Sequence, residues 1–147
     1  MRMLWLSAAV LVTLAAGAAR AAEPVNTNGS PVALGGYDVV AYFTEGKPVA
    51  GQAAHEAQWN GARWRFASAA HRERFLKEPE RFAPRYGGYC AYAVSRGYTA
   101  PVAPEAWRIV DDRLYLNYSK DVQKLWEREI PANIKKADTN WPGVLAK

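Results

Sequence analysis

The side chains in this sequence best suited to metal binding or nucleophilic chemistry are the single cysteine, Cys90, and the two histidines, His55 and His71. One thiolate and two imidazoles are a suitable donor set for copper or zinc, because thiolate selects Cu(I) and Zn(II) and imidazole binds both metals. The same thiolate beside an imidazole could instead act as a nucleophile. The sequence has no Cys-x-x-Cys or His-x-x-x-His spacing, so these residues form a site only if the fold brings them together.

Each of the three residues also has a structural interpretation. Cys90 stands in the run Tyr86–Gly97, among three tyrosines and after a Gly-Gly pair, and free cysteine is one of the most buried residue types. His71 can pack one helical turn from Phe75, and His55 can be a surface residue. A Cys–His thiol enzyme is the less favoured chemistry, because the chain has no resolving cysteine and no orienting group at a recognisable spacing.

Residues 1–21 are predicted to be a signal peptide. Met1-Arg2 is a positive start, Leu4–Ala18 is an apolar run too short for a comfortable membrane span, and Ala19-Arg20-Ala21 fits a cleavage site. Residues 22–31 then form an extended lead-in, and residues 32–147 form one folded domain. We therefore expect a periplasmic or secreted protein with no stable membrane insertion after cleavage.

The composition of the remaining chain excludes nucleic acid as a binding partner and leaves other partners open. Removal of Arg2 and Arg20 with the signal leaves a net charge of +3 (17 − 14), which is too mild and dispersed for a nucleic-acid-binding protein. Trp5 is the only one of the six tryptophans that leaves with the signal. The other five are more than a core of this size needs. A module that binds a non-metal small molecule or a protein partner, with a structural Cys90, is therefore the alternative to a metal site.

Two hairpins with following helices are predicted to position these residues. In the first, the strands His55–Trp59 and Ala62–Phe66 flank Asn60-Gly61, a dipeptide that tolerates the positive φ angles of a type I′ turn. Ser68 is placed to cap a helix from Ala69 to about Lys77.

The sequence of the second hairpin aligns with that of the first without a gap. Strands Trp107–Val110 and Arg113–Tyr118 flank Asp111-Asp112, and Ser119 precedes a helix that runs to about Glu129. After Pro131, apolar residues recur at helical spacing. The sequence therefore predicts a single small α+β domain made of two ββα units, each a hairpin plus a Ser-capped helix, with a C-terminal helix. The equivalent pairs are Asn60 and Asp111, Trp64 and Tyr115, Ser68 and Ser119, and Phe75 and Trp126.

Several spaced motifs resemble the YHS domain, a small module appended to heavy-metal-transporting ATPases and some hydroxylases and also found in small exported proteins. The closest likeness lies in Trp64–Phe75 (WRFASAAHRERF) and Pro79–Phe82 (PERF). The chain after the signal as a whole resembles the stand-alone exported proteins of this kind. The motifs that carry this wider likeness are Gly36-Tyr37-Asp38, Tyr86–Tyr92 and Asn140-Trp141-Pro142.

The resemblance implies a metal-handling role, although the usual cysteines are replaced. In the metal-associated modules cysteines supply the ligands, and their positions fall here on Ala67, His71 and, in an earlier motif, Ala41. The resemblance therefore implies that Cys90 compensates, together with His55 and His71. The expected function is an exported binding protein for a soft transition metal, with copper first and zinc as the alternative, rather than an enzyme.

Overall fold

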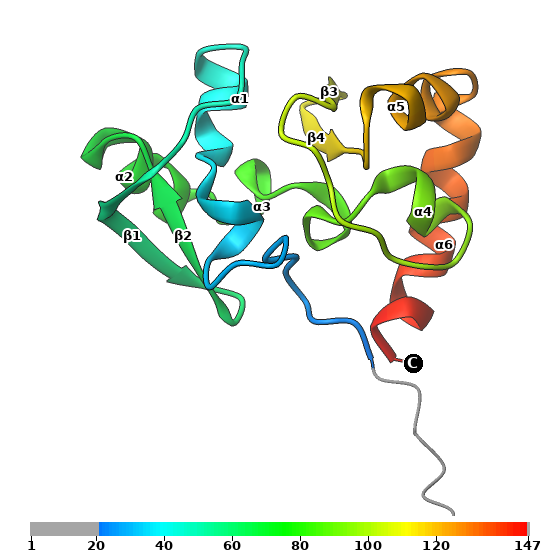
Figure 1. Ribbon diagram of the computed structural model, residues 1–147, viewed down its shortest axis with the longest axis horizontal. Helices are drawn as coiled ribbons and strands as arrows, with labels where there is room; N and C mark the ends of the chain where they lie inside the picture. Colours follow the sequence, from blue (N-terminus) through cyan, green and yellow to red (C-terminus); the bar gives the residue numbers. More distant parts are fainter. Residues whose placement is uncertain (1–20, 147) are drawn as a thin grey trace, which may run out of the picture.

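The chain forms two antiparallel hairpins in separate two-stranded sheets, each followed by a helix, and a long C-terminal helix completes the fold (Figure 1). The computed structural model describes residues 21–146. The predicted α+β class, with two hairpins, their helices and a C-terminal helix, is confirmed. The elements in order are η1 (Ala33–Gly36), α1 (Val39–Thr44), β1 (Gln52–Trp59), β2 (Ala62–Phe66), α2 (Ala69–Lys77), α3 (Pro79–Phe82), η2 (Arg85–Gly88), α4 (Ala91–Ser95), β3 (Trp107–Val110), β4 (Arg113–Leu116), α5 (Lys120–Glu127) and α6 (Ile130–Ala146).

Both hairpin turns have a left-handed backbone, which was predicted for Asn60-Gly61. The φ angles are 49° at Asn60 and 78° at Gly61, and 49° and 60° at Asp111 and Asp112. Asn, Asp and Gly adopt positive φ angles at little cost, and the twist of a turn with these angles matches the twist of the flanking strands. The register is the one that a two-residue loop gives, because Trp59 pairs with Ala62 and Val110 with Arg113.

The two predicted serine caps are also present. The Ser68 hydroxyl accepts a hydrogen bond from the backbone N–H of His71, and the Ser119 hydroxyl accepts one from Val122, each at 3.1 Å. Such a bond satisfies one of the N–H groups that a helix start leaves without a partner. The first turn of α2, which carries His71, is therefore fixed by the local sequence.

The likeness of the two halves extends further upstream than the sequence indicated. Each unit begins with a tight turn of three residues at positive φ, which are Leu34-Gly35-Gly36 in η1 and Tyr86-Gly87-Gly88 in η2. Each turn leads through a tyrosine into a short helix, α1 or α4, whose N-cap residues are Asp38 and Cys90. The fold therefore places Cys90 and Asp38 at equivalent positions.

Each hairpin is covered by an aromatic residue from its own helix, and the two residues are the equivalent pair Phe75 and Trp126. Phe75 of α2 lies against Trp64 with ring centroids 5.1 Å apart, and Trp126 of α5 lies against Tyr115 at 5.2 Å. Phe75 and Trp126 are fully buried, and truncation of such a residue to alanine costs about 3–5 kcal/mol. Phe75 belongs to an apolar cluster that also takes in Leu114 and Leu116 of the second hairpin, and Trp126 belongs to a second cluster with Tyr115.

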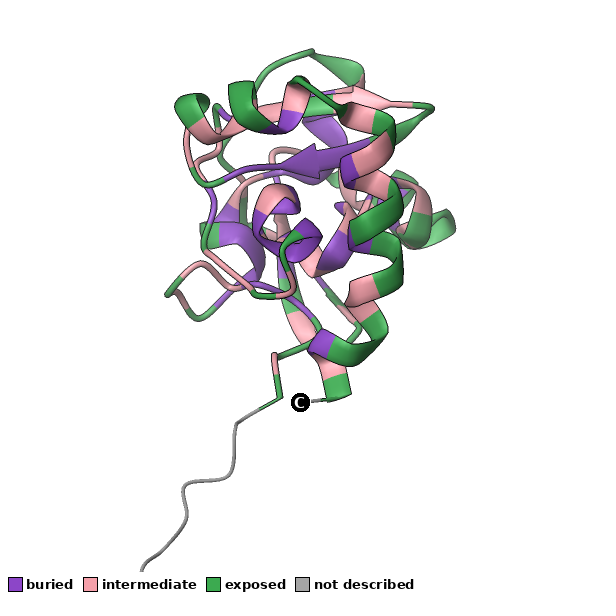
Figure 2. Cartoon of the chain, turned by 90° about the vertical axis from the view of Figure 1, so that its right-hand side faces the viewer, coloured by how far each residue is buried: buried purple, intermediate pink, exposed green. Residues whose placement is uncertain are grey.

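The C-terminal helix α6 packs along α4 and supports the second unit. The Asn140 side chain donates to the backbone carbonyls of Val94 and Ser95 at 3.0 and 3.2 Å. These bonds satisfy carbonyls that the end of α4 leaves without a helical partner. Figure 2 shows β4 buried in the interior and the outer face of α6 exposed. Within residues 21–146, no helix is long and apolar enough to cross a membrane. The predicted signal peptide lies outside the described residues, apart from Ala21.

Candidate functional site

The most densely bonded side chain of the first unit is the carboxylate of Asp38. Asp38 is fully buried and caps α1, where its Oδ1 accepts from the N–H groups of Val40 and Ala41 at 2.9 and 3.2 Å. Its Oδ2 accepts from the N–H of Ala67 at 2.8 Å and from the His71 ring at 2.6 Å. A buried carboxylate needs such donors, because desolvation without them is costly. Asp38 thus ties α1 to β2 and α2.

The His71 imidazole lies between Asp38 and Thr44. Its Nδ1 is 2.6 Å from Asp38 Oδ2, and its Nε2 is 3.3 Å from Thr44 Oγ1. The side chain is 15% exposed, whereas that of Asp38 is 0% exposed. One ring nitrogen therefore lies in the protein interior and the other lies at the surface, beside the exposed Thr44.

The contact with Asp38 decides which ring nitrogen carries the proton. An ionised carboxylate can only accept, so Nδ1 must be the donor. Nε2 then has a free lone pair when the ring is neutral. The Thr44 hydroxyl also lies 3.3 Å from the Val40 carbonyl, and its single proton can serve only one of these acceptors at a time. His71 can therefore present Nε2 to an incoming ligand, because the Thr44 hydroxyl can donate to the Val40 carbonyl instead.

Cys90 is 1% exposed and is itself hydrogen-bonded. Its thiol donates to Asn117 Oδ1 at 3.5 Å, and its sulfur accepts from the N–H of Tyr118 at 3.3 Å. Burial raises the pKa of the Cys90 thiol above its ordinary value, and nearby backbone hydrogen bonds offset part of this rise. The protonated thiol is therefore favoured at neutral pH, whereas metal binding and nucleophilic attack both need the thiolate.

The sulfur of Cys90 does in the second unit what one oxygen of Asp38 does in the first. Asp38 Oδ2 accepts from Ala67 N–H, immediately before the capping Ser68. Cys90 Sγ accepts from Tyr118 N–H, immediately before the capping Ser119. Both contacts join the start of a short helix to the end of a hairpin. This equivalence gives Cys90 a structural role.

Asn117 takes over the role of the other Asp38 oxygen. In the first unit Asp38 Oδ1 accepts from Val40 N–H, in the first turn of α1. In the second unit Asn117 Oδ1 accepts from Tyr92 N–H at 3.1 Å, in the first turn of α4. The residue equivalent to His71 is Val122, so the paired imidazole belongs to the first unit alone. This asymmetry marks His71 as the chemically distinct feature.

The third predicted ligand, His55, lies half-buried in β1. It falls where the pairing with β2 shifts register, between Gln52 and Glu56. Throughout residues 21–146, no group of three or more His, Cys, Asp or Glu side chains is arranged to hold a metal ion. Cys90 and His71 have different hydrogen-bond partners, so the contacts described here do not unite the predicted set.

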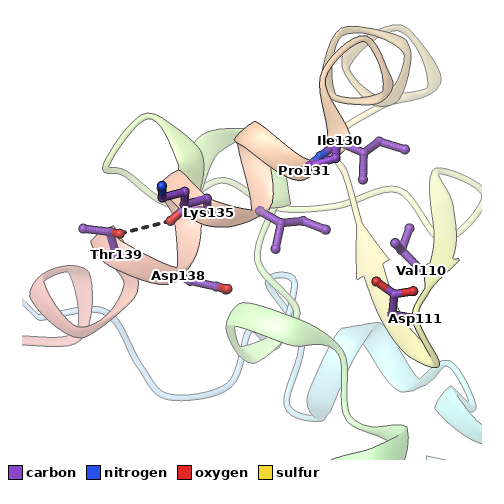
Figure 3. A pocket seen from close by; sticks show the side chains of 8 residues that line it. Val110, Asp111, Ile130, Pro131, Lys135, Asp138 and Thr139 are labelled. Atoms are coloured by element: carbon purple, nitrogen blue, oxygen red, sulfur yellow. Dashed lines mark hydrogen bonds between the residues drawn. The ribbon is translucent and has the colours of Figure 1, made fainter.

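A hollow of about 540 Å³ lies elsewhere on the molecule and is lined by none of the three predicted ligands. It is formed by the β3–β4 turn and by α6, and Asp111 and Asp138 face each other across it (Figure 3). Asp138 already accepts a hydrogen bond from the Tyr86 hydroxyl at 2.9 Å and pairs with Arg85 at 3.4 Å. These bonds hold η2 against α6.

Sequence reasoning missed Asp38, the residue that organises this site. The available signal was an aspartate directly before an apolar run of helical length, which is typical of an N-cap. Its second role, as the partner of His71, joins positions far apart in the chain and had no local signal. Comparison with protein-family models, curated proteins and solved structures gives no match to this chain.

Proposed function

We propose that this protein is a small exported binding protein that holds a soft transition metal, copper first and zinc as the alternative, through the imidazole of His71. The observation that carries the proposal is the 2.6 Å hydrogen bond from His71 Nδ1 to the buried carboxylate of Asp38. A metal-ligating histidine usually donates its other ring N–H to a carboxylate or a carbonyl in this way.

The bond to Asp38 would serve metal binding in two ways. It fixes the tautomer whose free lone pair is on Nε2, the nitrogen that lies at the surface, and it fixes the orientation of the ring. The resemblance to YHS modules supports the same position, because His71 stands where the metal-associated modules have a cysteine.

A single oriented imidazole fits an open and exchangeable metal site. Closed structural zinc sites use four protein ligands, and the described residues do not offer such a set. The remaining positions would be taken by water, by donors of a partner molecule or by His55. Cys90 keeps its structural role in this proposal, because its sulfur is occupied by Asn117 and Tyr118.

An anaerobic Cu(I) titration of single variants tests this function. We expect His71→Gln to abolish the high-affinity event and Asp38→Asn to weaken it about 10- to 100-fold. Cys90→Ser should keep the stoichiometry of the unmodified protein, and His55→Gln shows whether the second histidine takes part. Full binding by His71→Gln would reject the proposal. Export is tested separately by the mass of the chain recovered outside the cytoplasm, which should begin at Ala22.

A second candidate is a non-metal ligand- or partner-binding module with a structural Cys90. It is favoured by two half-buried tryptophans, Trp59 and Trp141, which line two adjoining hollows. The Cys–His thiol enzyme gains no support from the geometry, because the Cys90 thiol is buried, has a raised pKa and is bonded to Asn117 rather than to an imidazole.

A further inference from the structure

Two hollows that share a wall of tryptophan and proline lie between the two units. One has a volume of about 320 Å³ and the other of about 270 Å³, and both are lined by Trp59, Ala83, Pro84 and Trp141. We call these two hollows together the tryptophan groove. Cavities for small molecules are commonly found where two structural units meet. The volumes suit a small molecule rather than a protein chain.

The two indoles are held in place on their inner sides. Trp59 packs against Trp64 and Phe75 with ring centroids 5.7 Å apart in both cases, and Trp141 packs against Tyr86 and Tyr89 at 6.1 Å. Trp59 and Trp141 are nevertheless only half-buried. A flat ligand would therefore meet aromatic faces that are already ordered, and little side-chain entropy would be lost on binding.

One end of the tryptophan groove is lined by two arginines, of which Arg85 is paired with Asp138 and Arg113 has no carboxylate partner among the contacts described. The smaller hollow is lined by two arginines, Arg85 and Arg113, and by one carboxylate, that of Glu80. Arg113 is exposed and donates to the backbone carbonyl of Glu80 at 3.5 Å. A guanidinium has five N–H donors in a planar fork, so most of the Arg113 fork is available to a carboxylate or another planar anion.

The apolar wall and the basic end together define the ligand. We propose that the tryptophan groove binds a small organic anion with a flat apolar body, the body lying against Trp59 and Trp141 and the anionic group bonding to Arg113. A cation of the same shape would meet Arg85 and Arg113 with the wrong sign of charge. This site shares no residue with the Asp38–His71 pair, so its test is independent of metal binding.

Three aromatic probes of one shape and different charge test the proposal. They are naphthoate, the neutral naphthamide and the naphthylmethylammonium ion, each titrated into isotope-labelled protein while the indole N–H signals of Trp59 and Trp141 are followed by NMR. We expect naphthoate to shift both indole signals and to bind about tenfold more tightly than naphthamide, as a charge-assisted hydrogen bond provides. The cation should bind most weakly.

Matched variants separate the charge from the aromatic surface. Arg113→Gln should reduce naphthoate binding to the level of naphthamide, whereas Arg128→Gln, an equal change of charge at an exposed residue outside the groove, should leave it unchanged. Trp141→Leu keeps apolar volume but removes the flat face, so it should weaken all three probes, with retained folding shown by circular dichroism. Equal affinities for the three probes, shifts confined to other signals, or no binding at all would overturn the proposal.

Discussion

Replacement of Asp38 by asparagine isolates the bond on which the metal-binding proposal depends. Asparagine keeps one acceptor oxygen, which can still serve Val40 and Ala41, but its amide group would face Ala67 N–H and His71 Nδ1. The His71 ring can respond by moving its proton to Nε2. The backbone N–H of Ala67 has no such choice and loses its acceptor.

The expected cost follows from these contacts. A buried N–H without a partner costs about 1–3 kcal/mol, and hydrogen bonds to a charged group contribute more than neutral ones. We therefore expect Asp38→Asn to lower the free energy of unfolding by about 2–4 kcal/mol, a large part of the 5–15 kcal/mol typical of a domain. Urea unfolding followed by tryptophan fluorescence measures this, with an unchanged m value showing that two-state unfolding is preserved.

Thr44→Val is the matched control for this substitution. It removes only the hydroxyl beside His71 Nε2, at an exposed position, so the loss should stay within about 0.5 kcal/mol. A loss for Asp38→Asn no greater than that for Thr44→Val would refute the reasoning, because it would mean that the carboxylate does not organise the site.

Three further predictions concern the second unit and Cys90. Asn117→Ala should destabilise the fold by about 2–4 kcal/mol in urea unfolding, because Tyr92 N–H loses its acceptor and a buried side chain is removed; a change below about 0.5 kcal/mol would contradict this role. The Cys90 thiol should react with a disulfide reagent at neutral pH at least about a hundredfold more slowly in the native protein than in urea, because it is buried; similar rates would show an accessible thiol. The pKa of Cys90 is raised in the folded state, so its contribution to stability is complete below the unfolded value near 8.5 and is lost as the pH rises toward the folded value. Unfolding free energy measured across that alkaline range should therefore fall more steeply for the unmodified protein than for Cys90→Ser, and parallel curves would count against the raised pKa.

Local signals predicted the parts of the fold that depend on neighbouring residues. Asn60-Gly61 predicted the first turn and Ser68 predicted the cap of α2, because each acts on backbone groups within a few residues. The two Gly-Gly pairs indicated sharp turns, but the equivalence of the upstream halves of the two units was not recognised. Leu34 and Tyr86 both adopt positive φ, a conformation that such side chains rarely take, so residue type did not reveal that each turn begins one residue before its glycines.

The candidate site depended on long-range pairing, which residue types alone do not reveal. The sequence identified His71 as a candidate ligand, but the partner that orients it, Asp38, lies on another element. The sequence analysis interpreted Cys90 as the anchor of a site, because it is the only thiol in a chain that we expect to be exported. Only the tertiary contacts with Asn117 and Tyr118 show the sulfur acting as a hydrogen-bonding group between α4 and β4.

X-ray absorption on the copper- or zinc-loaded protein tests the central claim most directly, because it separates nitrogen and sulfur ligands. Zinc–nitrogen bonds are about 2.0–2.1 Å long and zinc–sulfur bonds about 2.3 Å. With His71 as the ligand and Cys90 as a structural residue, the spectrum should show nitrogen and oxygen neighbours only, and His71→Gln should lose the bound metal. A sulfur neighbour, or a spectrum that is the same in His71→Gln, would contradict the account.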